Sequence, residues 1–447
     1  MARVRVSCTL LLWGLGTANA QRTKPDIDSA TLQAHITGEK LMKNLNAFQK
    51  LADENGGNRA FGLPGFQASS DYIWHQLANI DGTTAWKQDF PALFNQVKSV
   101  ELTVDKEQPL RVVAVSYSPS TPGSGIRADL MLGPDGPAGC NDTSYVNPDV
   151  KGKIVLVERY ACNETSGTFA GKVLPAARAG ASAVIVYRDG MANVTGGRLP
   201  GPGPDYIPTG YINRADGLQL ASRLSAGERV QAYFQMTQVT ETRITHNIIA
   251  ETDGNPESVV MLGAHLDSVQ GGPGINDNGS GSSLLLEVFL ATARYRTKNK
   301  VRFVWWGAEE NGGVGSEFYC TNLTKFPKEA DGILAYLNFD MVSRGFFYVG
   351  DGDGSTYGDV GAPGSEVIEK IWLDYFKEQG VPTDAGGIGG GSDYEFFRTI
   401  LNKPIGLLFT GAGEPEDPCY HLACDDIANV DPQMLLLNAR VSRWRES

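Results

Sequence analysis

Residues 259–293, VVMLGAHLDSVQGGPGINDNGSGSSLLLEVFLATA, decide the fold. The apolar run 259–263 is typical of a buried strand, and the apolar run 282–293 is long enough for a helix. A glycine-rich loop joins them, and such a loop lets the backbone approach other groups closely. The stretch also carries three side chains that can bind a metal ion: His265, Asp267 and Asp277. This order of strand, loop and helix is typical of an α/β protein, in which ligands bind at the carboxyl ends of the strands.

The same alternation continues toward the C-terminus. Strand-like apolar runs occupy residues 301–306, 334–339 and 405–409, and helical segments occupy residues 315–322 and 365–378. The sequence therefore predicts the α/β class, with a central mixed sheet that is mostly parallel and is sandwiched by helices.

A different pattern lies between residues 112 and 236. Short apolar runs such as 154–157 and 183–187 are separated by Gly, Pro, Asn and Asp, and a single helical segment covers residues 170–179. This pattern predicts a mainly β module inserted into the first domain. The predicted division is a signal peptide at 1–20, a first domain at 21–111 and 237–447, and an insert at 112–236.

The N-terminus has the layout of a cleavable secretory signal. Arg3 and Arg5 precede an apolar run, and the small residues 18–20 follow it. No later stretch approaches the roughly 20 apolar residues of a membrane helix, so we expect a secreted, extracellular protein without a membrane anchor. The net charge of −12 argues against nucleic acid as a partner. We expect a monomer.

The cysteines outside the signal fit an oxidising compartment, where disulfides persist. Closeness in sequence favours the pairs Cys140–Cys162 and Cys419–Cys424, which leaves Cys320 as a free thiol. Four sequons are expected glycosylation sites: Asn141, Asn163, Asn193 and Asn322. A further sequon at Asn278 lies inside the candidate site and is expected to be unoccupied.

Ionisable side chains follow three of the predicted strands. His265 and Asp267 come after the first, Glu309 and Glu310 after the second, and Asp340 after the third. Each taken alone has a plain alternative, a polar cap at a strand end or a solvated helix start. Adjacent carboxylates at the mouth of a buried sheet, however, cost desolvation energy and repel each other unless a cation compensates them.

His421 lies in the segment DPCYHLACD, between two cysteines. A short loop closed by a disulfide would hold an imidazole rigidly, as a metal ligand requires, although a purely structural loop is the alternative. The other histidines, His35, His75 and His246, have no acidic cluster around them and are expected to be structural. One histidine and one carboxylate on each side of a shared carboxylate would supply donors for two zinc ions.

Other hydrolytic and nucleotide-binding chemistries lack their motifs. The sequence has no HExxH, no GxSxG and no GxxxxGK[ST]. Cys320 has no recognisable partner histidine for nucleophilic catalysis.

Six ordered motifs resemble those of the secreted leucine aminopeptidases of bacteria and fungi, which carry two co-catalytic zinc ions. The motifs are GAHLDS, GINDNGSGS, WWGAEENGGVGS, LNFDM, GGSDYEFF and CYHLACD, and the resemblance covers residues 245–429. The insert more loosely resembles a protease-associated (PA) domain. The resemblance implies a zinc peptidase fold and a metallo-aminopeptidase that hydrolyses the N-terminal peptide bond of peptides and proteins.

The resemblance also implies a role for each matching residue. His265 and Asp340 would bind one zinc ion, Glu310 and His421 the other, and Asp277 would bridge them and precede a cis peptide bond. Glu309 would be the general base toward a water held by both ions, Asp267 the aspartate behind His265, and Tyr420 a donor to the oxyanion. The family expectation for the N-terminal residue is leucine or another apolar residue, with Phe409 and Phe346 as candidates for its pocket.

This sequence departs from the family pattern at Gly391. Bacterial relatives commonly have Arg at this position of GGSDYEFF, so one substrate contact is missing or is supplied elsewhere. A carboxypeptidase or dipeptidase on the same scaffold is an alternative, but the motifs contain no Arg or Lys for a substrate carboxylate. A catalytically dead binding protein is a second alternative, disfavoured because every ligand and both catalytic carboxylates are present.

Overall fold

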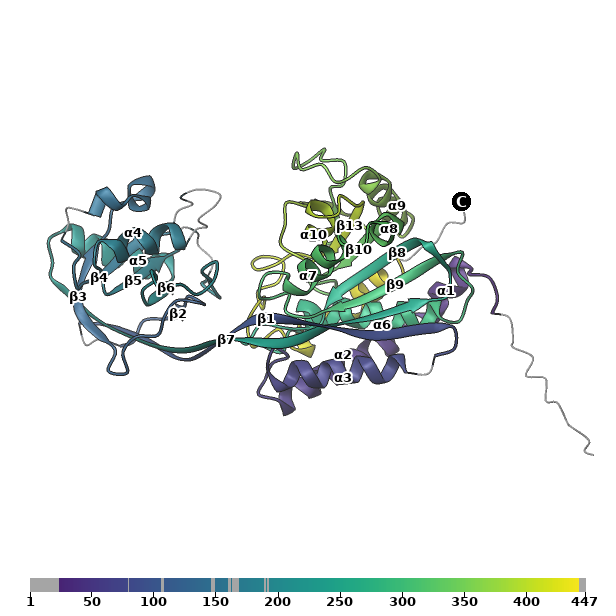
Figure 1. Cartoon of the computed structure of the whole chain (residues 1–447), viewed down its shortest axis with the longest axis horizontal. Coiled ribbons are helices and arrows are strands. Elements are labelled where there is room, and N and C mark those ends of the chain that lie inside the picture. Colours follow the sequence, from purple (N-terminus) through teal and green to yellow (C-terminus); the bar gives the residue numbers. More distant parts are fainter. Residues whose placement is uncertain are drawn as a thin grey trace, which may run out of the picture.

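Two long strands, β1 (Thr83–Val104) and β7 (Val230–Thr252), connect the two bodies of the molecule (Figure 1). They pair antiparallel along almost their whole length, from Thr83 opposite Thr252 to Val104 opposite Ala232. The computed structural model describes residues 24–441 except 79, 106–107, 146–148, 160–161, 163–168, 189 and 191–192. The predicted signal at 1–20 and the sequon at Asn163 lie outside the described residues.

The larger body contains the mixed sheet that the sequence predicts. Its strands lie in the order β12-β11-β13-β10-β8-β9-β7, and β1 pairs with β7. The central neighbours β13, β10, β8 and β9 are parallel, whereas β7 and β11 run antiparallel to their partners β9 and β13. The bounds are β8 Asn255–His265, β9 Asn299–Trp306, β10 Ile333–Phe339, β11 Tyr348–Gly350, β12 Asp384–Gly386 and β13 Ile405–Phe409.

Helices cover both faces of this sheet. One face packs against α1 (Ser29–His35), α2 (Gly38–Glu54), α3 (Pro64–Leu77), α6 (Gly281–Thr292), α9 (Ser365–Glu378) and α11 (Pro432–Ala439). The other face packs against α7 (Val314–Leu323), α8 (Pro327–Gly332) and α10 (Tyr394–Thr399). Successive residues of β9 alternate between the two cores, Phe303 and Trp305 in one, Val304 and Trp306 in the other, as the period of a strand requires. The strand is therefore buried on both sides, and its sequence reads as a continuous apolar run.

Two helices show why their sequences fold as they do. The apolar side chains of α2 recur at Leu41, Leu45, Phe48 and Ala52, so that one face is buried, and the Thr37 hydroxyl caps its first turn by accepting the Lys40 N–H. In contrast, α6 is buried on nearly every side, which matches its uninterrupted apolar sequence. It starts directly after the loop that carries Asp277, and its packing therefore fixes that loop.

The smaller body is the insert. Its strands continue the hydrogen-bonded path from β7 in the order β3 (Ile126–Leu132), β4 (Ile154–Glu158), β5 (Ala183–Tyr187), β6 (Thr209–Ile212) and β2 (Val112–Ala114). Two α-helices lie against them, α4 (Ala170–Arg178) and α5 (Arg214–Ser225). Leu102 and Val104 of β1 and residues 230–236 of β7 pack in the core of the insert. The ribbon therefore belongs to both bodies, and β1 is a strand that the sequence patterns did not reveal.

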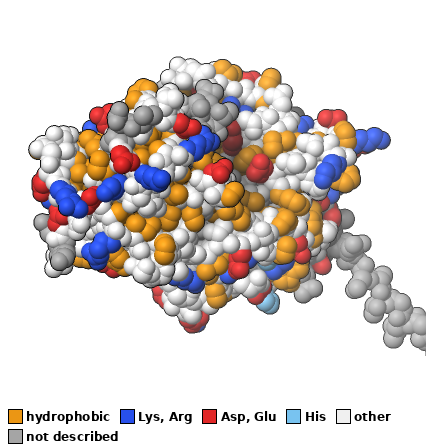
Figure 2. Space-filling model, turned by 60° about the vertical axis from the view of Figure 1, so that its left-hand side comes forward, with side chains coloured by type: hydrophobic (Ala, Val, Ile, Leu, Met, Phe, Trp, Pro, Cys, Tyr) orange, Lys and Arg blue, Asp and Glu red, His pale blue; other side chains and the backbone are white. Residues whose placement is uncertain are grey.

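Both expected disulfides are present. Cys140 is joined to Cys162 in the insert, Cys419 is joined to Cys424, and Cys320 is a buried free thiol. Among the described helices, none is long and apolar enough to cross a membrane. Figure 2 shows basic, acidic and apolar side chains interspersed over one face of the molecule.

Candidate metal centre

The five side chains predicted as metal ligands meet at the carboxyl ends of three adjacent strands. His265 is the last residue of β8, Glu310 follows β9 and Asp340 follows β10. Asp277 lies in an irregular helical turn, Ile275–Ser280, before α6, and a cis peptide bond joins it to Asn278. His421 lies in the loop closed by the Cys419–Cys424 disulfide.

The carboxylate of Asp277 lies between the two imidazoles. Its Oδ1 is 3.2 Å from His265 Nε2, and its Oδ2 is 3.1 Å from His421 Nε2. On the first side, His265 Nε2 is also 3.2 Å from Asp340 Oδ1. On the second side, His421 Nε2 is 3.2 Å from Glu310 Oε2. The five side chains thus form two groups of three donors that share Asp277.

These donors fit two zinc ions. Nitrogen and oxygen ligands held tetrahedrally at about 2.0–2.1 Å from zinc lie about 3.3 Å from each other, close to the separations within each group. Glu310 Oε1 is buried and finds no hydrogen-bond partner among the described residues, so this carboxylate is not satisfied by the protein alone. One imidazole, one carboxylate and a shared carboxylate on each side are the ligand types that zinc prefers.

Carboxylates dominate the electrostatics of the cluster. Burial lowers the pKa of His265, but the carboxylates of Asp340 and Glu309 outweigh it and hold that pKa well above its ordinary value. Burial likewise acts against the charged form of His421, and Glu310 and Asp277 raise its pKa well above the ordinary value. Buried carboxylates in such number are therefore stable only beside positive charge, which protonated imidazoles or bound cations can supply.

Asp267 supports the segment after β9. Its side chain is fully buried, Oδ1 accepts the Glu309 N–H at 3.0 Å, and Oδ2 accepts the Glu310 N–H at 3.3 Å. Burial raises the pKa of Asp267 to about 6. His265 Nδ1 lies 4.0 Å from the Asp267 carboxylate and 3.0 Å from the Asp267 backbone oxygen. Asp267 thus lies behind His265, and its hydrogen bonds reach the backbone of the two glutamates.

Glu309 and Tyr420 lie at the edge of the cluster. Glu309 Oε2 is 3.9 Å from His265 Nε2, and burial raises the pKa of Glu309 well above its ordinary value. The Tyr420 ring stacks on the His421 ring with 3.8 Å between the centroids, and Tyr420 lines a cleft together with Glu310 and His421. Both side chains are therefore within the same site as the five donors.

Three further residues support the site, and the sequence analysis did not single them out. Asp425 is buried and accepts the N–H groups of Asn276 and Asp277 at 2.9 and 3.0 Å, which fixes the backbone of the shared carboxylate. Ser392 donates to Asp340 Oδ2 at 2.6 Å and so orients that carboxylate. Asp425 lies in the motif CYHLACD and Ser392 in the motif GGSDYEFF. Their position as polar residues inside these motifs is the sequence signal that could have identified them.

Arg59 is the third supporting residue. It is fully buried and donates to the backbone oxygens of Leu266, Pro273 and Gly274, the last two at 2.8 and 2.5 Å. Burial lowers the pKa of Arg59 to about 10. The guanidinium therefore ties together both ends of the loop that leads from β8 to Asp277. A single arginine more than 200 residues before its partners gives no sequence signal.

Two cavities flank the cluster. A pocket of about 340 Å³ is lined by Asp340 and by aromatic side chains that include Tyr348, Tyr394 and Phe409. A cleft of about 660 Å³ is lined on one side by Glu310, Tyr420 and His421 and on the other by residues of the insert and of β1.

The other predicted residues have varied surroundings. Phe409 lines the pocket, whereas Phe346 is 53% exposed. Asn141 and Asn193 are exposed, Asn322 is half-buried, and Asn278 is fully buried with its side chain bonded to the Phe339 carbonyl oxygen. Gly391 has a φ of 108°, in the left-handed region that favours glycine, so the backbone itself disfavours Arg at this position.

Comparison with known proteins places the chain in a family. Residues 247–443 match the model described as Peptidase family M28, and residues 126–220 match the PA domain. The chain is 36% identical to probable leucine aminopeptidase 2 of Arthroderma benhamiae over 93% of this chain and 85% of that protein. The chain belongs to peptidase family M28.

Further relatives of this M28 peptidase include bacterial proteins. An aminopeptidase of Pseudomonas aeruginosa is 35% identical over 97% of this chain and 86% of its own length. The solved structure of an aminopeptidase from Aneurinibacillus sp. strain AM-1 is similar at 26% identity and a TM-score of 0.75, over 93% of this chain and 94% of that one. The expected fold, the PA insert and the class of metallo-aminopeptidase are confirmed.

Proposed function

We propose that this M28 peptidase is a secreted two-zinc aminopeptidase that removes leucine or another apolar residue from the N-terminus of peptides and proteins. One observation carries the proposal: each oxygen of the Asp277 carboxylate faces a different imidazole, at 3.2 and 3.1 Å. A carboxylate shared in this way is suited to hold two metal ions side by side.

Each ion would have its own ligands in addition to Asp277. His265 and Asp340 would hold one, and Glu310 and His421 the other. When bound, two zinc ions supply Lewis-acid polarisation of the scissile carbonyl and make a water molecule nucleophilic near neutral pH. The protein contributes fixed ligand positions, through Arg59, Asp425 and Ser392.

The remaining steps belong to protein side chains. Glu309, with its backbone N–H held by Asp267, takes a proton from the attacking water and returns it to the leaving amine. The Tyr420 hydroxyl donates to the oxyanion that develops on the carbonyl oxygen. Its ring is held in place by stacking on His421.

The two flanking cavities support the direction of binding. The pocket beside Asp340 takes the N-terminal side chain, because its aromatic side chains and Leu407 suit an apolar group, while Glu416 is an acidic residue of the same lining. Its described lining contains no Lys or Arg for a substrate carboxylate, which disfavours the carboxypeptidase alternative. The rest of the peptide leaves through the cleft beside Glu310 and His421.

The two disulfides support secretion, since disulfides persist in oxidising compartments. Peptides and proteins with free N-termini are the proposed partners of a monomeric enzyme. Expression of the full chain in a secreting host, followed by N-terminal sequencing of the medium protein, tests this part. Retention of residues 1–20 on an intracellular product would contradict it.

The central test combines activity with metal content. The wild type is expected to hold two zinc ions and to hydrolyse leucine p-nitroanilide. A chelator should abolish this activity, and N-acetyl-leucine p-nitroanilide should not be hydrolysed. Glu309→Gln should keep both ions and lose most turnover, whereas Asp277→Ala should lose both ions. Asp353→Asn, at an exposed loop, is the matched control. Two ions retained after the Asp277 change would contradict the shared ligand, and near-normal turnover of Glu309→Gln would remove Glu309 from the mechanism.

A further inference from the structure

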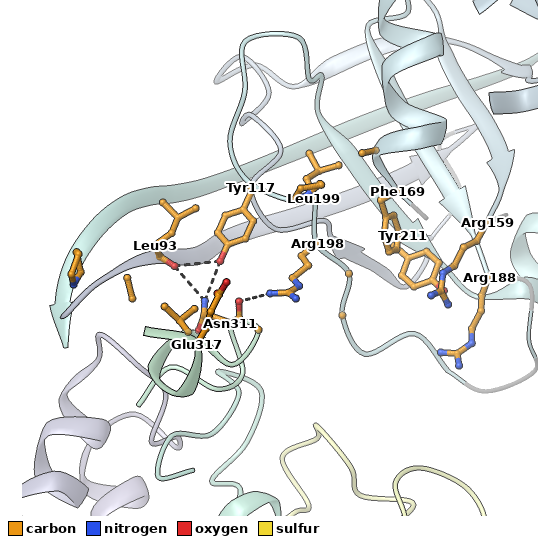
Figure 3. Close-up of a pocket in the computed structure, with 18 residues that line it drawn as sticks. Leu93, Tyr117, Arg159, Phe169, Arg188, Arg198, Leu199, Tyr211, Asn311 and Glu317 are labelled. Carbon is orange, nitrogen blue, oxygen red and sulfur yellow. Dashed lines mark hydrogen bonds between the residues drawn. The ribbon is translucent and has the colours of Figure 1, made fainter. Parts of the chain in front are cut away.

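A third cavity lies between the PA insert and the M28 body (Figure 3). Its volume is about 730 Å³. Leu93 of β1 and Asn311 and Glu317 lie on the side of the M28 body, and Arg159, Phe169, Arg188 and Tyr211 of the insert lie on the other, with Arg198 between them. We call this cavity the arginine chamber, after Arg159, Arg188 and Arg198.

The fold places two of the arginines side by side. Glu158 of β4 pairs with Tyr187 of the parallel strand β5, so the next residues, Arg159 and Arg188, extend from adjacent strand ends. The Arg159 guanidinium lies 5.7 Å from the centroid of the Phe169 ring. The parallel register therefore brings two guanidinium groups to one wall of the chamber.

Arg188 retains unused hydrogen-bonding capacity. Its Nη1 donates to the Asn193 backbone oxygen at 3.2 Å, while Nε is buried and has no partner among the described residues. Within the same described part of the chain, no carboxylate forms an ion pair with Arg188 or Arg198, and Glu317 is the one carboxylate among the lining residues. In a protein of net charge −12, the described lining of this chamber holds three guanidinium groups and one carboxylate.

The chamber adjoins the cleft at the metal centre. Tyr117, residues 196–198 and Asn311 line both cavities. Arg198 donates to the backbone oxygen of Asn311, the residue that follows the metal ligand Glu310. A peptide that extends from the metal centre through the cleft would meet Arg198 first and, beyond it, the other two arginines.

We propose that the arginine chamber binds a carboxylate of the peptide on the leaving-group side, either its free C-terminus or an acidic side chain. This proposal rests on the proposed function, which fixes the direction of the substrate. Guanidinium groups recognise carboxylates through charge-assisted, often paired hydrogen bonds, and the half-buried side chain of Arg188, which has no ion-pair partner among the described residues, can supply them. An extended peptide advances about 3.3 Å per residue, so the effect depends on peptide length.

Steady-state kinetics on matched peptides tests this site. The series Leu-(Gly)n with n from 1 to 6 is measured with a free C-terminus and as the C-terminal amide, with leucine p-nitroanilide as the reference substrate. The free acid is expected to have a kcat/KM about tenfold above that of the amide at one or two lengths, through KM, which is the size of one charge-assisted hydrogen bond. Peptide amides that carry Asp in place of the C-terminal Gly distinguish a free C-terminus from an acidic side chain. If the chamber also accepts a side-chain carboxylate, these amides should regain the tenfold higher kcat/KM.

Substitutions then assign the effect to the chamber. Arg188→Gln should lower the ratio of acid-peptide to anilide hydrolysis about tenfold, Arg188→Lys should lower it less, and Arg178→Gln, in the same insert but paired with Asp142, should leave it unchanged. Salt should reduce the wild-type preference because it screens the charges.

Equal rates for acids, amides and Asp-containing amides at every length in the wild type would overturn the proposal, whatever the variants do. An Arg188→Gln protein with the same ratio as Arg178→Gln would overturn it as well. Loss of zinc-dependent anilide hydrolysis would instead contradict the proposed function, so the two failures are distinguishable.

Discussion

Replacement of Asp267 by Asn isolates the role of one buried carboxylate. Its two oxygens accept the backbone N–H groups of Glu309 and Glu310. Asparagine has the same shape but offers one carbonyl oxygen, and its NH₂ group would face the second N–H as a donor. One of the two glutamates therefore loses its backbone anchor, and a buried N–H is left without an acceptor.

The size of the effect follows from these two contacts. A hydrogen bond to a charged acceptor contributes about 1.5–3 kcal/mol, and a stranded buried N–H costs about 1–3 kcal/mol. Together they predict a loss of about 2.5–6 kcal/mol. If the displaced glutamate carries this loss into the transition state, kcat/KM falls about 10²- to 10⁴-fold, since about 1.4 kcal/mol corresponds to a factor of ten.

The assay is hydrolysis of leucine p-nitroanilide, with zinc content measured on the same sample. Asp353→Asn is the matched control, because this exposed carboxylate also accepts a backbone N–H, that of Ser355 at 2.8 Å. Asp267→Ala should lose at least as much as Asp267→Asn, because it leaves both backbone N–H groups without an acceptor. An Asp267→Asn enzyme within threefold of the wild type, with normal zinc, would refute the reasoning.

Three further outcomes are expected. Arg59→Met should lower the free energy of unfolding in urea by at least about 3 kcal/mol, because three buried carbonyl oxygens lose their donor; a loss below 1 kcal/mol would show that the loop does not depend on Arg59. Burial lowers the pKa of His246 to about 4, so the neutral imidazole contributes its full stability above pH ~6.5 and this contribution is lost as the pH falls toward ~4. The loss in the free energy of unfolding is at most about 3 kcal/mol and is reduced by solvent screening. In urea titrations at different pH values, His246→Gln should flatten this pH dependence. Glu416, which lines the aromatic pocket and accepts the Tyr348 hydroxyl at 3.0 Å, should permit lysine as N-terminal residue; Glu416→Gln should raise the leucine-to-lysine p-nitroanilide ratio about tenfold, and an unchanged ratio would exclude contact with a substrate cation.

The sequence predicted those parts of the fold in which a local pattern and the tertiary contacts agree. Strands β8, β9 and β10 are apolar because helices cover both of their faces, so burial is visible in the residues themselves. Strand β1 escaped prediction because its burial changes along its length, with exposed, half-buried and buried residues in irregular order. Its extended form is dictated by pairing with β7, more than 100 residues away.

The same distinction applies to the candidate site. Three of the five proposed ligands follow strand ends, His421 lies in a short disulfide loop, and Asp277 lies in the glycine-rich loop before α6, all of which a sequence pattern reveals. Asp425 and Arg59 act on the backbone of segments 149 and about 210 residues away, and no periodicity connects such partners. Asp425 could have been noticed only as a polar residue of its motif, and Arg59 is found only when the fold is known.

Gly391 is a position at which a sequence motif and the backbone conformation of the fold both bear on the site. Its φ of 108° lies in the region that favours glycine, so the arginine that the family resemblance leads us to expect at this motif position would be strained here. The sequence left open whether the substrate contact is lost or is supplied elsewhere. Arg198 lines the cleft from the insert and is held against the segment after Glu310 by its bond to the Asn311 oxygen. Arg198 belongs to the insert, so if the proposal for the arginine chamber holds, the insert supplies a cation on this side of the site, and selection of the distal part of a substrate depends on the PA domain.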